Sequence, residues 1–376
     1  MPWKEATAMS QREEFVVKAL GEDANMSELC RAYGISRKTG YKWLNRYLTE
    51  GRDGLGDRSR RPRHSPKQTP QEIEQAILDG RKEHPAWGGR KLKRWLENRG
   101  HTGLPAPSTI TAILRRHGQL DPKESAKHQP FTRFEKARPN ELWQMDFKGH
   151  FQVGNGERCH PLTVLDDHSR FLIGLQACAN ETRHTVQEHL TAFFRAYGLP
   201  ERMLMDNGSP WGDNNTYTPY TVLTVWMLRL SIRVSHSRPY HPQTLGKDER
   251  LHRTLQAELL NRTTFHTLPD CQPDFDRWRD VYNLERPHEA LDLNPPMIRY
   301  HPSERPFPEV LPPVIYPDGC ATRKVDLNGR ISFQGRLLRV GRAFRGQTVG
   351  LQHDLLEDGL VHVFFNNFHV RTLDLR

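Results

Sequence analysis

The sequence predicts a multidomain protein, with all-α units at the front, an α/β domain in the middle and a small all-β domain at the end. Three observations predict this order. The chain has 376 residues, which is too long for one ordinary domain. Its apolar residues repeat with helical spacing over the first 120 positions, mix strand and helix spacing between 140 and 300, and alternate in strand fashion after 320. The surplus of positive charge lies entirely in the first third.

The composition is that of a chain with packed cores and a polar surface. Hydrophobic residues make up 36% and charged residues 27% of it, which leaves enough apolar material for several cores. No stretch approaches the roughly 18 to 20 consecutive apolar residues that span a bilayer. The first residues also lack the apolar centre of a signal peptide. Five scattered cysteines and 19 histidines show no zinc-site spacing, so we expect a cytoplasmic protein with reduced cysteines and no membrane partner.

The charge is distributed unevenly. Residues 1–140 hold 28 of the 55 lysines and arginines but only 17 of the 45 acidic residues, a net charge of +11, whereas the remainder has −1. A basic front on a neutral remainder indicates a polyanion-binding module attached to another domain. A solubility device would not need its charge concentrated in one segment. We therefore expect DNA as a partner and association with the nucleoid.

Residues 1–55 are predicted to form a helix-turn-helix DNA-binding domain. We expect a second helix that Ser27 caps and Gly34 ends, and a third helix that Ser36 caps. The third helix would turn Tyr41 and Trp43 partly inward. Its outward side chains suit phosphates and base edges in a major groove: Arg37, Lys38, Thr39, Lys42 and Arg46. An ordinary three-helix bundle with a charged face is the alternative.

Residues 56–68 are predicted to be a basic linker. Glycine, proline and serine surround its arginines, so no packed core can form there. Such an arm suits a minor groove, whose negative potential attracts arginine, although a flexible charged linker explains it as well. The candidate DNA-binding residues are Arg58, Arg60, Arg61 and Arg63.

Residues 69–120 are predicted to form a second helix-turn-helix DNA-binding domain. A first helix would begin at Thr69-Pro70, and Ser108 would cap the last helix. That last helix would present Arg115 and Arg116 outward to DNA. Residues 121–139 are then a linker.

Residues 140–300 are predicted to form an α/β domain with an acidic site. Three strands, a helix, a strand, a helix, a strand and a helix follow one another, which is the order of the ribonuclease H-like fold. Asp146 and Asp206 lie at the ends of apolar strands, and Glu249 lies on a helix that has leucines four positions apart. Carboxylates that converge from two strands and a helix need cations, and hard oxygen ligands suit Mg²⁺ or Mn²⁺. A pair of such ions suits in-line attack at a phosphodiester.

The same domain resembles the transposases of bacterial insertion sequences that share the retroviral-integrase catalytic core. The matching segments are WQMDFKG, TVLDDHSRF, MDNGSP, SRPYHPQTLGKDERLHRTL and YNLERPHEAL. The resemblance implies that Asp146, Asp206 and Glu249 are the catalytic, metal-binding triad for two Mg²⁺ ions, with Mn²⁺ as a substitute. The 42 residues between Asp206 and Glu249 make this spacing somewhat long, and Asp248 is a rival. Neighbours on a helix point about 100° apart, however, and Glu249 matches the motif position.

The resemblance also implies a function. The chain would be a DNA transposase that binds the terminal inverted repeats of its element and carries out metal-dependent phosphodiester hydrolysis and transesterification, that is, 3′-end cleavage and strand transfer into target DNA. Synapsis of two ends implies a homo-oligomer, at least a dimer. A transposase-derived DNA-binding regulator without catalysis is the alternative. A ribonuclease H-like hydrolase for another nucleic acid is a third reading, but it leaves the two helix-turn-helix units unexplained.

Four residues near the triad can be given expected roles. Lys247 and Arg250 flank the acidic part of the helix, and we expect them to contact DNA phosphates. Asp166 and Asp167 match a family feature, but an aspartate turn explains them better than a metal site does.

The end of the chain is predicted to be a proline-rich linker, residues 301–319, and a β-rich domain, residues 320–376. Asn328-Gly329 and Asp358-Gly359 are typical of hairpin turns. A five-stranded SH3-like barrel fits this pattern and is similar to related transposase tails. It would bind DNA or bridge subunits, unless it serves only as a folding cap.

Overall fold

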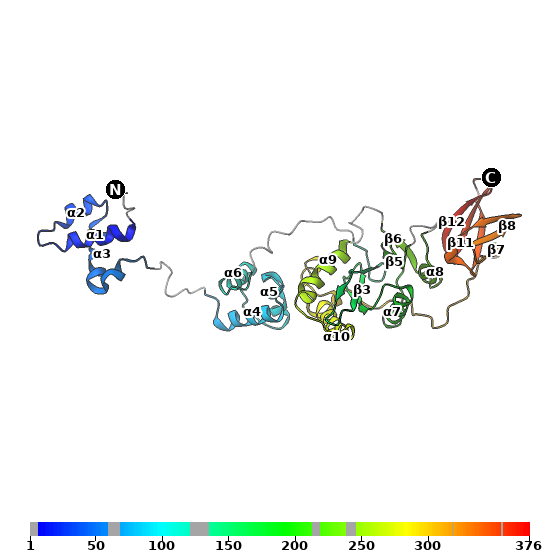
Figure 1. The fold of residues 1–376 in the computed structure, drawn as a ribbon, viewed down its shortest axis with the longest axis horizontal. Coiled ribbons are helices and arrows are strands. Elements are labelled where there is room, and N and C mark those ends of the chain that lie inside the picture. The colour runs from blue at the N-terminus through cyan, green and yellow to red at the C-terminus, as the bar shows by residue number, and fades with distance from the viewer. Residues whose placement is uncertain are drawn as a thin grey trace. The chain divides into compact units, whose positions relative to one another are not determined.

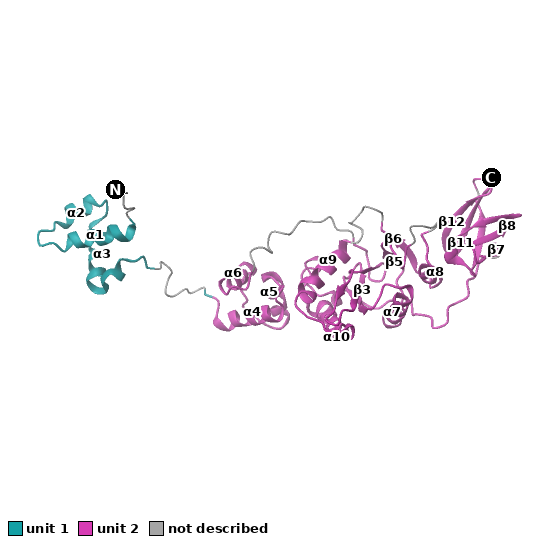
Figure 2. Ribbon diagram, viewed as in Figure 1, with its two compact units in different colours: residues 1–68 teal, residues 69–376 magenta. Residues whose placement is uncertain are grey.

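The computed structural model describes residues 7–58, 68–120, 135–212, 219–237, 246–317, 319–354 and 356–376. The chain divides into two compact units, residues 1–68 and 69–376 (Figure 2). Within the described residues, none of the helices combines the length and the apolar character needed to cross a membrane. Arg60, Arg61 and Arg63, three of the predicted DNA contacts, lie outside the described residues.

The first unit is a small helical domain of the predicted kind. Helices α1 (Ala8–Ala19), α2 (Met26–Ala32) and α3 (Arg37–Glu50) are followed by a 3-10 turn. Their core consists of buried side chains from all of these elements: Phe15, Val16, Cys30, Trp43 and Leu55.

Two details of this domain differ from the prediction. The cap of α2 is Asn25, whose side-chain oxygen accepts from the backbone N–H groups of Ser27 and Glu28. Ser27 therefore lies inside the helix, because the asparagine two residues earlier already satisfies the first amides. Tyr41 is 44% exposed rather than turned inward. The prediction for α3 is confirmed, since Ser36 caps it by accepting from the Thr39 N–H.

The second unit opens with three more helices, α4 (Gln71–Glu83), α5 (Gly89–Asn98) and α6 (Pro107–Arg116). They close over a core that includes Trp87 and Trp95. The predicted caps were wrong here. Pro70 and Ala106 occupy the cap positions without side-chain hydrogen bonds, so Thr69 lies before α4 and Ser108 inside α6. In α6 a proline occupies the first helical position, where its fixed φ already suits the helix.

The middle of this unit contains a mixed sheet of six strands. They are β1 (Trp143–Phe147), β2 (Phe151–Gln152), β3 (Arg158–Asp166), β4 (Leu172–Cys178), β5 (Arg202–Met205) and β6 (Arg233–His236). The order is β2-β3-β1-β5-β6, and β4 pairs with β3. Strand β1 is antiparallel to β3 and parallel to β5, and β5 is parallel to β6. The predicted order of strands and helices is confirmed, with the two-residue β2 added.

Helices cover both faces of this sheet (Figure 1). Helices α7 (Arg183–Tyr197) and α8 (Val222–Arg229) share one apolar cluster with β1, through Trp143 and Met145. Helices α9 (Gly246–Leu255) and α10 (Leu268–Asp280) share another cluster with β3 and β4. Because side chains alternate along a strand, Gln144 and Asp146 of β1 face the α9 side.

The tail is all-β but is arranged differently from the predicted five-stranded barrel. Strands β7 (Ala321–Lys324), β10 (Thr348–His353), β11 (Leu360–Phe365) and β12 (Phe368–Asp374) form one antiparallel sheet in the order β12-β11-β10-β7. Strands β8 (Arg330–Phe333) and β9 (Arg336–Arg339) form a separate hairpin. The described strands thus number six, and their pairing does not close into a barrel. The Gly329 carbonyl accepts from the Val340 and Gly341 N–H groups, which continues the β8–β9 pairing beyond Arg330 and Arg339.

The tail sheet also packs against α8. Val225 and Leu228 of α8 belong to the same buried cluster as the tail strands. The Asn366 amide donates to the Leu228 carbonyl at 3.2 Å and to the Ser231 hydroxyl at 2.9 Å. The proline-rich segment is therefore not the only connection between the α/β domain and the tail.

Candidate active site

Two of the predicted acids lie at one edge of the sheet. Asp146 is near the end of β1, and Asp206 directly follows β5. These strands are parallel neighbours, so their carboxyl ends meet at the same edge. Glu249 lies in the first turn of α9, which packs on the sheet face toward which Asp146 points.

Asp146 is surrounded by negative charge. Burial raises its pKa to about 7, with further raising contributions from Asp206, Glu181 and Glu249. Among the main influences on this pKa, only the hydrogen bond from the Phe147 N–H lowers it. The other two acids of the predicted triad therefore both act on Asp146, and no cationic side chain ranks among the main influences on it.

Asp206 is held firmly. Its Oδ1 accepts from the Gly208 N–H at 2.9 Å and from the Trp211 indole N–H. Trp211 is in turn stacked on Phe147, with ring centroids 5.4 Å apart. The His236 ring nitrogen Nδ1 contacts the Asp206 carbonyl at 2.8 Å. These contacts orient the carboxylate and leave its other oxygen without a hydrogen bond from a described residue.

The two neighbouring acids of α9 point in different directions, as their helical spacing requires. Glu249 is exposed, and Asp248 is fully buried with 0% exposure. Neither carboxyl oxygen of Asp248 has a hydrogen-bond partner. Burial raises the pKa of Asp248 well above its usual range, and the charges of Asp146 and Asp167 raise it further. The inward acid of this helix is therefore Asp248, while the motif residue Glu249 faces outward.

The three triad carboxylates do not form a closed cluster. Over the described residues, the one group of three or more His, Cys, Asp or Glu side chains with ligand atoms all within 4.8 Å is Glu83, His84 and Glu285. Arg99 already pairs with Glu83 at 3.4 Å and with Glu285 at 3.0 Å, which offsets the negative charge of that group. Glu249 as a metal ligand thus remains a prediction, because the ligand atoms of the three acids do not all lie within 4.8 Å of one another.

Lys247 is paired inside the protein. Its ammonium group donates to the Asp167 carboxylate, and its side chain is only 17% exposed. Asp167 also accepts from the Gln144 amide at 2.7 Å and from the Lys136 N–H at 2.8 Å. This pairing ties the first turn of α9 to the sheet. The DNA contact expected for Lys247 remains a prediction, and the observed contact gives Lys247 a positioning role.

The neighbouring Asp166 is the turn residue that the sequence predicts. Its carboxylate accepts from the Asn140 N–H and from both the N–H and the hydroxyl of Ser169. Those contacts occupy both of its oxygens and fix the turn between β3 and β4.

A second connection between α9 and the sheet was not predicted. His252 Nε2 contacts the Thr163 hydroxyl at 2.9 Å, and that hydroxyl donates to the Asp146 carbonyl at 3.0 Å. The imidazole therefore donates to Thr163. Burial lowers the pKa of His252 to about 4, which leaves it neutral near pH 7. Asp248 and His252 are four residues apart, so helical spacing alone would have placed both on the inward face.

The DNA-contact candidates in α3 differ in availability. Arg37, Lys38 and Lys42 are exposed. The Thr39 hydroxyl is engaged with Ser36 at 2.9 Å, and Arg46 lies over the Trp43 ring. Lys42 also lies over the Trp43 ring, at 4.6 Å from its centroid, so Arg37 and Lys38 are the exposed cations of this set without a contact to a described residue.

The remaining candidates lie on other elements. Arg58 pairs with Glu50, and Arg116 pairs with Glu74. Arg115 and Arg250 are exposed. Each stays a prediction, and the two paired arginines would have to exchange a carboxylate for a phosphate.

Family comparisons identify the class of protein. Residues 136–242 and 230–296 match two integrase core domain models. Residues 39–114 match a homeodomain-like domain, and residues 11–63 match a helix-turn-helix domain. Residues 320–376 match the C-terminal domain of the IS481 family transposases. In chain order, segments of this protein therefore match helix-turn-helix, integrase core and transposase C-terminal domain models.

Individual relatives agree with this class. A Geobacillus stearothermophilus protein assigned as the transposase of insertion sequence element IS5376 is 22% identical, over 97% of this chain and 88% of the relative. The transposase of transposon Tn552 from Staphylococcus aureus is 24% identical, over 71% of this chain and 58% of the relative. The Gag-Pro-Pol polyprotein of simian retrovirus SRV-2 is 30% identical over 32% of this chain and 6% of that polyprotein. The resemblance to insertion-sequence transposases with an integrase core is confirmed.

Solved structures show more distant likeness. The HTLV-2 integrase catalytic core domain, in complex with magnesium, is 16% identical with a TM-score of 0.33, covering 44% of this chain and 99% of that chain. A chain of the simian T-cell lymphotropic virus intasome is 16% identical with a TM-score of 0.36, covering 72% of this chain and 93% of that chain.

Proposed function

We propose that this protein is a transposase that binds the terminal inverted repeats of its element, cleaves their 3′ ends and joins them to target DNA. One observation carries the proposal: Asp146 and Asp206 meet at the carboxyl edge of two parallel strands, with Glu249 in the first turn of the helix that packs on that sheet, in a segment that matches an integrase core model. The basic helical units in front would supply recognition of the ends. An assembly of at least two copies would hold two ends together.

The residues present fit a divalent metal site. The three acids offer only hard oxygen ligands, which Mg²⁺ and Mn²⁺ prefer. Burial and then the repulsion of the neighbouring acids raise the pKa of Asp146, and a cation beside it would relieve that repulsion. Asp146, Asp206 and Glu249 would hold the two Mg²⁺ ions. When bound, such ions lower the pKa of an attacking hydroxyl and stabilise a leaving oxygen.

The surrounding residues would fix the geometry of this site. Gly208 and Trp211 hold one oxygen of Asp206, so the other is directed to a ligand. Thr163 holds the backbone of Asp146 and links it to His252. Lys247 holds the start of α9, and with it Glu249, against Asp167. Preorganised supports of this kind would keep Asp146 and Asp206 in position for a metal, whereas Glu249 would still have to approach the other two acids.

Two displacements at phosphorus would follow at the one site. In the first, a water oxygen bonds to the phosphorus at the element end, and the bond to the 3′ oxygen breaks. In the second, the freed 3′ hydroxyl attacks a phosphodiester of the target, which forms one P–O bond and breaks another. Neither step needs a protein nucleophile, so no serine or tyrosine is assigned to the site.

A cleavage assay tests the proposal. Purified protein is incubated with Mg²⁺ and labelled DNA that carries the repeats flanking its gene. We expect nicking and joining that vanish in Asp206→Asn while end binding survives. Asp358→Asn, in an exposed turn of the tail, is the matched control and should cleave normally. End binding without any cleavage by the wild type would favour the regulator, and cleavage indifferent to the repeats would favour a general nuclease.

A further inference from the structure

A further acid, Glu181, lies at the acidic edge of the sheet. Strand β3 is antiparallel to both β1 and β4, so the carboxyl ends of β1 and β4 meet at the same edge. Glu181 follows Cys178, the last residue of β4, by three positions. The strand order therefore brings a carboxylate outside the predicted triad to the edge where Asp146 and Asp206 lie.

The backbone around Glu181 is fixed by its two neighbours. The Asn180 side-chain oxygen accepts from the Thr182 N–H at 3.1 Å. Thr182 in turn caps α7, because its side chain accepts from the Thr185 N–H. Glu181 thus lies between two residues whose side chains hydrogen-bond to the backbone of the same short turn, and its position does not depend on contacts of its own.

The side chain of Glu181 is held by His160 of β3. His160 Nδ1 lies 2.7 Å from Glu181 Oε1, and the imidazole donates, because an ionised carboxylate can only accept. The adjacent residue, Pro161, accepts from the Lys148 N–H at 3.0 Å, which fixes His160 beside the segment that follows Asp146. The other oxygen of Glu181 receives no hydrogen bond from a described residue. One carboxylate oxygen is therefore held and the other is open.

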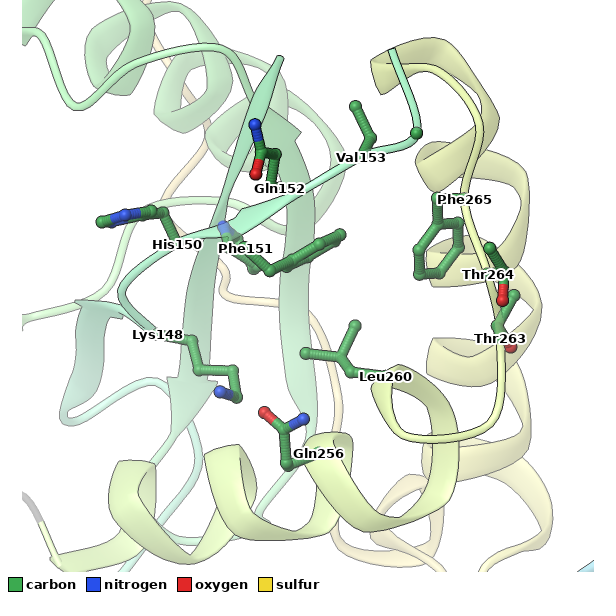
Figure 3. A pocket seen from close by; sticks show the side chains of 12 residues that line it. Lys148, His150, Phe151, Gln152, Val153, Gln256, Leu260, Thr263, Thr264 and Phe265 are labelled. Carbon is green, nitrogen blue, oxygen red and sulfur yellow. The ribbon is translucent and has the colours of Figure 1, made fainter. Parts of the chain in front are cut away.

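The cation nearest to Asp146 in the sequence points elsewhere. Figure 3 shows the segment between β1 and β2, which lines a cavity of about 420 Å³. The Lys148 side chain points toward Gln256 in this view, whereas the His150 ring points to the opposite side. The His150 ring lies 5.3 Å from that of His160. Lys148 is thus directed away from the imidazole that holds the further acid, and no cationic side chain ranks among the main influences on Asp146.

Glu181 lies at a distance from the other acids that suits a hydrated ion. Its negative charge is one of those that raise the pKa of Asp146. The ligand atoms of Glu181, Asp146 and Asp206 do not all lie within 4.8 Å of one another, and His160 holds Glu181 in place. Mg²⁺ is bound at about 2.0–2.1 Å and usually keeps several of its waters in a protein. A carboxylate that does not touch the ion can accept hydrogen bonds from those waters.

We propose that Glu181, held by His160, accepts hydrogen bonds from the waters of a divalent ion that Asp146 and Asp206 bind, and thereby positions that ion. The inference rests on the proposed function and adds an acid to the predicted triad. His160 acts only through Glu181 and does not touch the ion. Residues that support a metal site from behind its ligands contribute about 10- to 100-fold to metal affinity. Glu181→Gln keeps the shape of the side chain and removes its charge.

Metal binding tests this proposal without catalysis. Mn²⁺ is titrated into the full-length protein, and the free ion is measured by electron paramagnetic resonance. The variants are Glu181→Gln, His160→Ala and the two combined, with Asp206→Asn as the loss of a ligand. Glu188→Gln is the matched control, because Glu188 also faces a histidine, His184 at 4.0 Å, but lies 69% exposed on α7. Thermal unfolding shows whether each variant is folded.

We expect Glu181→Gln to weaken Mn²⁺ binding about tenfold or more, and Glu188→Gln to leave it within about twofold of the wild type. His160→Ala should weaken binding as well. The double variant should be no weaker than Glu181→Gln alone, because the histidine acts through that carboxylate. In the cleavage assay, a raised Mg²⁺ concentration should restore Glu181→Gln to within about threefold of the wild-type rate, since mass action then fills the site. Asp206→Asn should not be restored.

Four results would overturn the inference. Wild-type Mn²⁺ affinity in Glu181→Gln would do so, and the proposed function would survive it if Asp206→Asn still loses metal binding and cleavage. Additive losses in the double variant would mean that His160 does not act through Glu181. Cleavage by Glu181→Gln that no Mg²⁺ concentration restores would mean that Glu181 touches the ion or the reacting groups. A wild type that binds no Mn²⁺ would overturn both the inference and the metal site of the proposed function.

Discussion

Replacing Asp248 with leucine should make the protein more stable and leave it active. Asp248 is fully buried, and neither of its oxygens has a hydrogen-bond partner. Leucine has nearly the same branched shape, so it can occupy the space without a large repacking cost. The change removes an unsatisfied polar group from the α9 side of the sheet and keeps the neighbouring Glu249 intact.

The size of the stabilisation follows from the burial. An unpaired buried polar group costs about 1–3 kcal/mol. In a domain of this size each kcal/mol moves the Tm by about 2–4 °C, so the rise should be about 2–12 °C. Burial also raises the pKa of Asp248, so the folded protein holds a proton that the unfolded chain releases. The stabilisation from this bound proton is complete below the pKa of Asp248 in the unfolded chain, about 4. It is lost as pH rises through the pKa of Asp248 in the folded protein. The gap in Tm between variant and wild type should therefore widen with rising pH.

Thermal unfolding of the full chain, measured between pH 5 and pH 8, provides the stability readout. End cleavage with Mg²⁺ provides the functional one, with Glu249→Gln as the comparison. Asp248→Leu should cleave within about threefold of wild type. Glu249→Gln should lose at least about 100-fold, because even outer-shell residues of metal sites cost 10- to 100-fold.

Two results would refute this reasoning. A lower Tm for Asp248→Leu would mean that the carboxyl group has a stabilising partner. Loss of cleavage in a folded Asp248→Leu protein, with activity retained in Glu249→Gln, would make Asp248 the third catalytic acid.

Three further predictions concern the supports of the site and the front of the chain. Thr163→Val should lower the free energy of unfolding by about 1–3 kcal/mol, because it leaves the partly buried His252 N–H without its acceptor and removes one hydrogen bond to the Asp146 carbonyl; an unchanged value in urea unfolding would contradict this. The Mg²⁺ concentration for half-maximal cleavage should rise about tenfold per pH unit below pH 7, since a proton then competes with the metal for Asp146, and a flat profile between pH 7 and pH 5.5 would contradict this. Deleting residues 1–68 should abolish end-specific binding in a filter assay. It should leave the circular dichroism of the remaining unit native, since those residues form a separate unit. Unchanged end specificity would disprove the interpretation that both helix-turn-helix domains are needed to recognise the DNA ends.

The sequence predicted the positions of the acids well because their settings are local. Asp146 and Asp206 each end an apolar run, and a run of that length bounded by turn residues specifies a strand. Glu249 lies in a helix with leucines at regular spacing. The same spacing places Asp248 three residues before Leu251, on the buried side, so the inward position of Asp248 was available from the sequence.

Other features could not be predicted because they depend on tertiary contacts. The contact from His252 through Thr163 to Asp146 requires the register of β1 against β3, which pairs Asp146 with Thr163. The pairing of Lys247 with Asp167 joins residues 80 positions apart. The helix caps were misplaced for a different reason, since asparagine and serine are almost equally good caps and Asn25 stands only two residues before Ser27.

The shared core of α8 and the tail sheet limits how this protein can be rearranged. A tail joined only by a proline-rich segment could be exchanged between relatives or fused elsewhere as a module. Here Val225 and Leu228 belong to the buried core of the tail, and they lie on a helix between β5 and β6. Removing the tail would expose that face of α8, and β6 carries the His236 ring that contacts Asp206. A boundary for grafting or truncation therefore belongs outside residues 135–376, because the α/β domain and the tail share a buried core.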